Sequence, residues 1–93
     1  MPESELLDNQ ELMLILMEEC AEVTQAISKV FRFGLDTDYN EKTNRERLEE
    51  EVGDLLCCVE LLISSGVMNQ ENVTKAKYNK ILKLKKWSNL NIE

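Results

Sequence analysis

The sequence contains no histidine, only one proline and three glycines, and few aromatic residues. Without histidine, the chain has no imidazole to act as a general base, to activate a nucleophile or to bind a metal ion. Three glycines are too few for a backbone loop that cradles phosphate, and the GxxxxGK pattern of such loops is absent. Any chemistry must therefore use carboxylates, amines, hydroxyls or water.

Long hydrophobic runs are also missing. The longest, such as residues 12–17, are too short to span a bilayer, and residues 1–20 lack the features of a secretion signal. The formal net charge of −7 should repel nucleic acids and anionic membranes, so we expect neither as a partner. We expect a soluble, cytoplasmic protein whose contact with any phosphate compound is mediated by cations.

A chain of 93 residues forms one domain at most, and no linker, repeat or low-complexity tract divides it. We predict a single helical domain over residues 1–93, with a lead-in over residues 1–8 and a tail over residues 88–93. A lone chain of this size buries only about two-thirds of the surface that its unfolded form exposes. Self-association is therefore a reasonable expectation.

The pattern of apolar residues predicts an all-α fold with three long helices. A hydrophobic content of 43% with little glycine or proline suits helices better than a sheet. Asp8 followed by Glu11 resembles a capping box, and apolar residues then recur at helical spacing until Gly34, so the first helix is expected over residues 9–33. Residues 35–43 contain turn formers and are predicted to form a loop with room for a short extra turn.

The second and third helices have their own start signals. Thr43 and Glu46 repeat the capping-box pattern, and the apolar residues that follow predict a helix over residues 44–65. Asn69 is a favourable cap for a third helix, expected from residue 70 to about residue 86. Lysines crowd the last turns of this helix, where the helix dipole favours positive charge.

Carboxylates occupy positions where apolar residues are expected. Glu19 lies within the apolar stripe of the first helix, with Glu22 and Glu18 along one edge of it, and Glu51 with Asp54 repeats the arrangement on the second. Burying clustered like charges is costly unless a cation neutralises them. If the two helices pack antiparallel, the two acidic pairs can face each other and bind a hard ion such as Mg²⁺, or Mn²⁺ in its place.

Each of these features also has an ordinary structural interpretation. A single glutamate on a helix usually faces solvent, but an intrusion into the apolar stripe on two separate helices is harder to explain this way. Gly53, inside the second acidic segment, indicates either a close approach of a ligand or simply tight packing. Cys20, Cys57 and Cys58 lack CxxC spacing and are expected to be reduced core residues, which disfavours a soft metal.

The two acidic segments, EECAE at residues 18–22 and EVGD at residues 51–54, resemble the EExxE and ExxD signature of the MazG-like family of all-α nucleoside triphosphate pyrophosphohydrolases. The similarity covers about residues 10–65, and the lysine-rich residues 80–87 are similar to the tail of short, single-domain phage and bacterial members. The resemblance implies a helical bundle that is completed by oligomerisation, as a homodimer or a homotetramer.

The resemblance also implies roles for the acidic residues. Mg²⁺ would be held by the four residues Glu19, Glu22, Glu51 and Asp54. Glu18 would be the catalytic residue that orients or deprotonates water. The implied reaction is attack of a metal-activated water at the α-phosphorus of a nucleoside triphosphate, which releases a nucleoside monophosphate and pyrophosphate.

Basic residues are the expected ligands of the substrate. By the same resemblance, Lys83 and Lys80 of the third helix would meet the phosphates. Lys29 and Arg32, at the end of the first helix, are candidates for contact with phosphate or base. Their alternative role is that of solvated charges near a helix C-terminus.

Several alternatives stay open. Phosphoribosyl-ATP pyrophosphohydrolases share the carboxylate chemistry, and a non-catalytic helical dimerisation or adaptor module would use the acidic residues only for solubility. A di-iron bundle is disfavoured because it needs a Glu-x-x-His pair. Tyr39 and Trp87 are candidates for stacking on a base, although aromatic residues near helix ends more often serve as packing caps.

Overall fold

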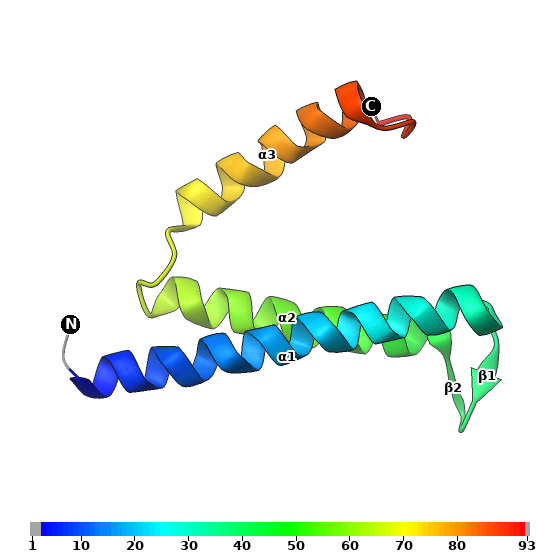
Figure 1. Cartoon of the computed structure of the whole chain (residues 1–93), viewed down its shortest axis with the longest axis horizontal. Helices are drawn as coiled ribbons and strands as arrows, with labels where there is room; N and C mark the ends of the chain where they lie inside the picture. Colours follow the sequence, from blue (N-terminus) through cyan, green and yellow to red (C-terminus); the bar gives the residue numbers. More distant parts are fainter. Residues whose placement is uncertain (1–2, 93) are drawn as a thin grey trace.

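The computed structural model describes residues 3–92, with side chains from residue 8 onward. It contains the helices α1 (Glu3–Phe33), α2 (Asn44–Ser64) and α3 (Gln70–Trp87) and the short strands β1 (Asp38–Tyr39) and β2 (Lys42–Thr43), as Figure 1 shows. The predicted all-α fold with three long helices is confirmed. Residues 1 and 2 of the expected lead-in and residue 93 of the expected tail lie outside the described residues.

The first helix begins earlier than predicted. Asp8 and Glu11 lie inside α1, so they do not form the expected cap. The residues before them are mostly glutamate and leucine, which favour helices, so local propensity extends the helix toward Glu3. The predicted end is confirmed, because Gly34 follows with φ of +100° and its N–H donates to the Val30 carbonyl at 2.9 Å.

The predicted starts of α2 and α3 are also confirmed. The Thr43 hydroxyl accepts a hydrogen bond from the Glu46 N–H, and the Glu46 carboxylate accepts one from the Thr43 N–H, each at 3.1 Å. The bond that the Thr43 N–H donates to the Glu46 carboxylate, followed by one from the Thr43 hydroxyl, holds the pKa of Glu46 below its ordinary value. At the start of α3, the Asn69 side chain accepts from the Asn72 N–H at 3.1 Å.

The segment between α1 and α2 differs from the prediction, because it contains a β-hairpin where we expected a loop with an extra turn. The strands β1 and β2 pair antiparallel around a two-residue turn, in which Asn40 and Glu41 have φ of 51° and 69°. Positive φ at both positions is the conformation that matches the twist of a tight hairpin. Strands of two residues are too short to show a sequence period, so the hairpin has no pattern to detect.

Side chains of α2 fix this hairpin in place. The Arg45 guanidinium donates to both carboxylate oxygens of Asp36 at 2.9 and 3.2 Å, which holds the pKa of Asp36 below its ordinary value. The Arg47 Nη2 donates to the Tyr39 carbonyl at 2.6 Å, and Lys42 forms an ion pair with a carboxylate of α2. The hairpin is therefore held against the start of α2.

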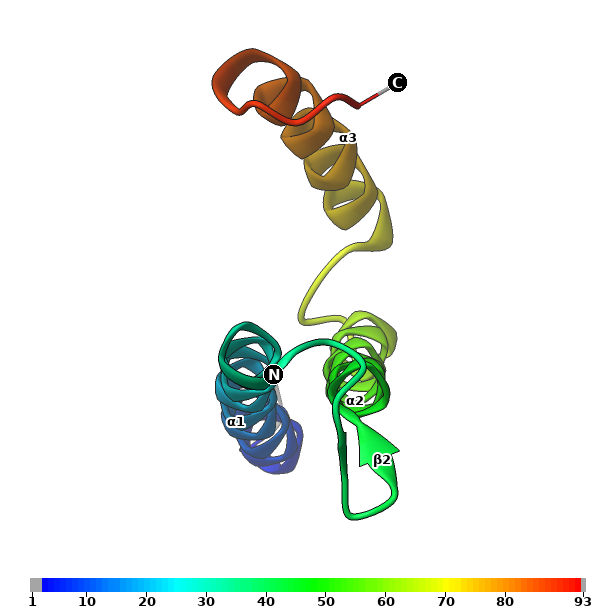
Figure 2. The same ribbon diagram turned by 90° about the vertical axis from the view of Figure 1, so that its right-hand side faces the viewer.

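The helices α1 and α2 lie side by side and antiparallel, whereas α3 extends away from them (Figures 1 and 2). The buried apolar residues are few: Ala26, Cys58 and Leu62. Of the cysteines expected in the core, only Cys58 is buried, while Cys20 and Cys57 are exposed. No helix in the described part of the chain is long and apolar enough to cross a membrane.

Many large apolar side chains are exposed to solvent in the single chain. Phe31, Trp87 and Leu56 have 86%, 77% and 51% of their surface exposed, and no residue of α3 is buried. A Cβ added at Gly53 would meet nothing within 4 Å, so tight packing against the described part of the chain does not explain this glycine, and close approach of a ligand stays a prediction. In the described part of the chain, α1 and α2 thus cover only part of their apolar surface, and α3 covers little of its own.

Candidate metal centre

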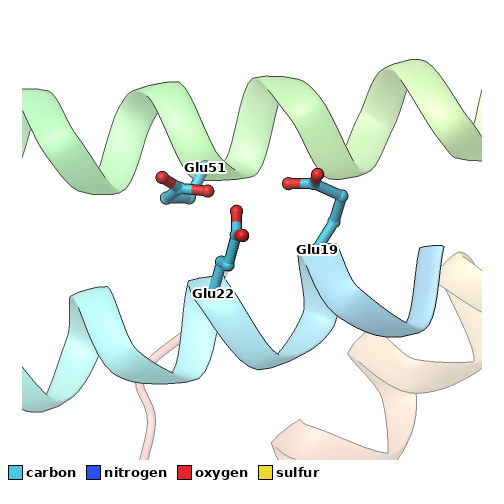
Figure 3. A group of neighbouring side chains, drawn as sticks. All are labelled: Glu19, Glu22 and Glu51. Atoms are coloured by element: carbon cyan, nitrogen blue, oxygen red, sulfur yellow. The ribbon is translucent and has the colours of Figure 1, made fainter. Parts of the chain in front are cut away.

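Three carboxylates meet in the space between α1 and α2. Glu19 and Glu22 project from α1 toward Glu51 of α2 (Figure 3). Each residue offers one oxygen atom, and these three atoms lie within 4.8 Å of one another. Glu19 and Glu51 are half-buried, and Glu22 is exposed. The antiparallel helices therefore bring together acidic groups that are about thirty residues apart in the chain.

The helical repeat explains why these residues face inward. Glu19 precedes the buried Ala26 by seven residues, and Glu51 precedes the buried Cys58 by seven residues. Seven residues are close to two full turns, so each glutamate lies on the same face as a core residue. The predicted position of Glu19 and Glu51 within the apolar stripes is confirmed.

Crowding makes full ionisation of the cluster unfavourable. Burial, followed by the charges of Glu22 and Asp54, raises the pKa of Glu19. A hydrogen bond with Glu22, followed by burial and the neighbouring charges, raises the pKa of Glu51. A hydrogen bond between two carboxyl groups requires one of them to keep a proton. Without a cation, ionisation of Glu19 and Glu51 is therefore less favourable than that of an ordinary glutamate.

Two oxygen atoms of the cluster lack a hydrogen-bond partner. The Oε2 atoms of Glu19 and Glu51 are buried and accept no hydrogen bond from any described residue. Orphaned buried oxygens are costly, and a cation would satisfy them. An all-oxygen set suits Mg²⁺ or Mn²⁺, which take their remaining ligands from water or substrate phosphates. Burial raises the pKa of the neighbouring Cys58, which keeps its thiol protonated and unsuited to metal binding. The residues present therefore fit a hard divalent cation.

The other two acidic candidates lie at the edge of this group. Asp54 is exposed and is not among the three converging carboxylates, but its charge contributes to the raised pKa of both Glu19 and Glu51. Glu18 is exposed, and its charge makes a smaller contribution at Glu19. Both residues are thus close enough to act electrostatically on the cluster, while their predicted roles as ligand and catalytic residue stay predictions.

The predicted basic residues lie in different places. Lys29 lines the space between α1 and α2 next to the carboxylates. Arg32 lies over the ring of its neighbour Phe33 at 4.8 Å and lines neither of the cavities described below. Lys80 and Lys83 lie on α3, which the fold holds apart from the carboxylates (Figure 2). Of the four predicted basic residues, one chain therefore brings only Lys29 to the site.

Two adjoining cavities surround this lysine. The acidic groove, about 240 Å³, is lined by Glu22, Gln25, Ala26, Lys29, Asn44, Arg47, Glu50 and Glu51. The hairpin cavity, about 460 Å³, is lined by Lys29, Phe33, Thr37, Asp38, Tyr39, Asn44 and Arg47. The two cavities share Lys29, Asn44 and Arg47, so these residues form the boundary between them.

Arg47 is a site residue that was not predicted from the sequence. A usable signal was present, because Arg47 precedes Glu51 by four residues and therefore lies on the same face of α2. Its position beside the hairpin was not predictable without the strands. The guanidinium lies 5.8 Å from the Tyr39 ring centroid, and its Nε is buried without a hydrogen-bond partner in the described chain.

Comparison with known proteins supports the interpretation of the acidic motifs. The family model of the MazG nucleotide pyrophosphohydrolase domain matches residues 7–87, a segment that includes both motifs, the hairpin and α3. Searches of curated proteins and of solved structures found no significant match. Members of the matched family are nucleotide pyrophosphohydrolases and typically depend on a metal ion. Because the match extends over most of the chain, the protein belongs to the MazG nucleotide pyrophosphohydrolase family.

Proposed function

We propose that the protein hydrolyses nucleoside or deoxynucleoside triphosphates to the monophosphate and pyrophosphate, with a divalent cation as cofactor. The observation that carries this proposal is the pair of buried, unpartnered carboxylate oxygens of Glu19 and Glu51, which belong to one cluster between two helices. Family membership supplies the reaction class, and these oxygens supply a reason for a cation.

The converging carboxylates of Glu19, Glu22 and Glu51 would hold the cation, with Asp54 as an additional ligand. Mg²⁺ is the expected ion, and Mn²⁺ would serve in its place. When bound, the ion neutralises the phosphates and increases the acidity of a nearby water. The bound cation thus compensates the negative charge of the carboxylates, which lets this acidic protein bind an anionic substrate there.

The chain's own residues would complete the reaction. Glu18, exposed beside the cluster, orients the attacking water and accepts its proton. A bond forms between the water oxygen and the α-phosphorus, the bond from the α-phosphorus to the bridging oxygen breaks, and pyrophosphate leaves. Lys29, at the border of the acidic groove, compensates negative charge on the phosphates.

A pyrophosphate-release assay with purified chain tests this proposal. We expect turnover of at least one nucleoside triphosphate with Mg²⁺, and loss of activity by roughly 100-fold or more for Glu19→Gln and Glu51→Gln, because each removes a charged ligand. Mg²⁺ should also raise the melting temperature of the wild type, since it binds the folded state, and should not raise that of these variants.

Glu60→Gln is the matched control, because Glu60 is an exposed residue of α2 outside the acidic groove. It should keep both the turnover and the Mg²⁺ response. Release of orthophosphate in place of pyrophosphate would contradict the reaction. No Mg²⁺ effect on melting, with full stability of Glu19→Gln, would favour a non-catalytic adaptor module.

We also propose that the active form is an oligomer in which α3 of one chain packs on α1 and α2 of another. On α3, Lys80 lies on the same face as Val73, Leu84 and Trp87, at spacings of seven, four and seven residues. This face is apolar apart from its lysine, and the described part of the chain buries none of its residues. A basic helix suits the acidic surface of a second copy.

This arrangement would bring Lys80 and Lys83 to the carboxylates of the second chain, where they could meet the phosphates as the sequence predicts. Within one chain they cannot, because α3 lies apart from the site. Light scattering tests the assembly directly, since a particle of 10.8 kDa would be a monomer and would contradict it.

A further inference from the structure

Two cations at the boundary between the cavities have no anionic partner. Neighbouring Arg45 and Lys42 form ion pairs with Asp36 and Glu50, whereas Lys29 and Arg47 form none with any described carboxylate. Arg47 is half-buried, and its Nε is enclosed without an acceptor. An enclosed guanidinium donor is unfavourable unless an anion approaches it. The boundary therefore offers two unpaired cations and a free guanidinium donor to an anion such as a phosphate.

The cavity on the far side of these cations has aromatic walls. Phe33, at the end of α1, and Tyr39, on β1, both line the hairpin cavity. They remain 55% and 68% exposed, so their rings are available to a ligand. The volume of about 460 Å³ falls in the range of roughly 300–1,000 Å³ that is typical of small-molecule sites. Aromatic side chains that line such a space suit a planar heterocycle.

Polar groups on the cavity wall are placed for a sugar or for the edge of a base. The Asn44 Nδ2 donates to the Gly34 carbonyl at 2.9 Å, which fixes this side chain and leaves its Oδ1 as a free acceptor. Asp38 lines the same cavity and forms no ion pair with a described residue. Both groups accept hydrogen bonds, so they favour ligand groups that donate, such as hydroxyl or amino groups.

We propose that the hairpin cavity binds the nucleoside part of the substrate, with its base against Phe33 and Tyr39, and that Lys29 and Arg47 bind the phosphate attached to the sugar. The order of these groups along the two helices supports this. The aromatic cavity, the two cations and the carboxylates follow one another between α1 and α2. A nucleotide has the same order of parts. The inference rests on the proposed nucleotide substrate and assigns the hairpin as the element that selects it.

Binding of nucleoside monophosphates to the full chain tests the site without catalysis. Titrations by calorimetry, in EDTA, would use AMP, CMP, GMP and UMP with their deoxy forms, and inorganic phosphate as the reference ligand. We expect at least one monophosphate to bind at least tenfold more tightly than phosphate, because it also fills the aromatic cavity. Arg47→Gln should weaken both ligands by tenfold or more, whereas Tyr39→Leu should weaken the monophosphate and leave phosphate binding unchanged.

Matched variants separate the site from general effects. Tyr78→Leu is the same change at an aromatic residue of α3 with similar exposure, 66% against 68%, and should leave binding unchanged. Phe33→Leu should weaken only the monophosphate, and Lys29→Gln should weaken both ligands. Both residues lie on α1, so these variants test the site even if the hairpin misfolds when its own residues change. Equal effects of Tyr39→Leu and Tyr78→Leu, or monophosphate binding no tighter than phosphate binding, would overturn the proposal.

The two proposals can fail separately. If no triphosphate releases pyrophosphate but the monophosphate binds with the expected pattern of losses, the proposed reaction is wrong and the nucleoside site stands. If hydrolysis proceeds while Tyr39→Leu and Phe33→Leu retain the wild-type affinity for the monophosphate, the reaction stands and the base is bound elsewhere.

Discussion

The helices α2 and α3 begin in the same way and end up in very different surroundings. Each starts at a capping residue that accepts a hydrogen bond from a backbone N–H, at Thr43 and at Asn69. However, α2 buries Asn44, Cys58 and Leu62, while α3 buries none of its residues. A cap and a suitable composition are therefore enough to form a helix, but only apolar contacts with another element give it a position.

The charges of the two regions differ as strongly as their packing. The helix α3 contains six lysines and one glutamate, a formal net charge of +5, so the rest of the chain carries −12 of the total of −7. In α1 and α2 acidic side chains gather within the chain, as in the cluster of Glu19, Glu22 and Glu51. Opposite charge and open apolar surface on both regions together favour contact between chains.

The strongest test of this difference uses two inactive variants that complement each other. Glu51→Gln removes a metal ligand, and the double change Lys80→Ala with Lys83→Ala removes the proposed phosphate contacts from α3. If α3 serves a second chain, co-refolding the two variants should restore activity. In a two-fold dimer, half of the dimers are mixed and each has one intact site, which gives about a quarter of the wild-type rate.

The control for this experiment is Lys85→Ala, because Lys85 lies about 160° around α3 from Lys83. This variant should be fully active by itself. If the mixture shows only the summed activity of its two components, although light scattering shows mixed oligomers, then α3 acts within its own chain or has no role at the phosphates.

The next largest expected effect is on the pH dependence of stability. It compares the carboxylate cluster between α1 and α2 with the acidic residues near the hairpin. The folded-state pKa of Glu19 and Glu51 is raised above the ordinary value of 4.5, so their contribution to stability is fully present below that pH and is lost as the pH rises through the raised values. For Asp36 and Glu46 the pKa is lowered, so their contribution is present above the ordinary values and is lost in stronger acid.

Metal-free chain should therefore resist urea better at about pH 5 than at about pH 8, as measured by circular dichroism in EDTA. Mg²⁺ should reduce this difference, because it favours the charged carboxylates. In the double variant Glu19→Gln with Glu51→Gln, the free energy of unfolding should not decrease between these pH values. If it shows the same decrease as the wild type, the crowded carboxylates are not the groups responsible.

The comparison also explains which parts of the fold could be predicted from the sequence. Helix boundaries near Gly34, Thr43 and Asn69 were predictable because caps and positive φ depend on neighbouring residues. The start of α1 was missed because an apparent cap at Asp8 lies inside a longer stretch of helix formers. The hairpin was missed because its register depends on two turn residues and on anchors from α2, which are not periodic features.

The candidate site was predictable where it depends on one helix at a time. A carboxylate within an apolar stripe is visible in the sequence, so Glu19, Glu22 and Glu51 were found. Arg47 was missed because its importance comes from a cavity that three separate segments build together. Lys80 shows the opposite limit, since its side of α3 is evident from spacing, while the chain that it would contact under the proposed assembly is not encoded in any local pattern.

The smallest expected effect tests whether α2 stabilises the fold of the single chain while α3 stabilises the oligomer. Removing either cap, by Thr43→Ala or Asn69→Ala, should cost about 1 kcal/mol of helix stability. Thr43 also belongs to β2, so its loss should lower the unfolding free energy of the α1, hairpin and α2 unit. Asn69 serves only α3, so its loss should weaken the oligomer. Both copies in a two-fold dimer lose the cap, so the dissociation constant should rise about thirtyfold in sedimentation measurements.

The variants Thr43→Ser and Asn69→Asp keep a capping oxygen and should remain close to the wild type in both measurements. If Asn69→Ala lowers the unfolding free energy of dilute, dissociated chain as much as Thr43→Ala does, α3 must fold together with α1 and α2 in the same chain. The open position of α3 would then not be its position in solution, and its lysines would act within their own chain.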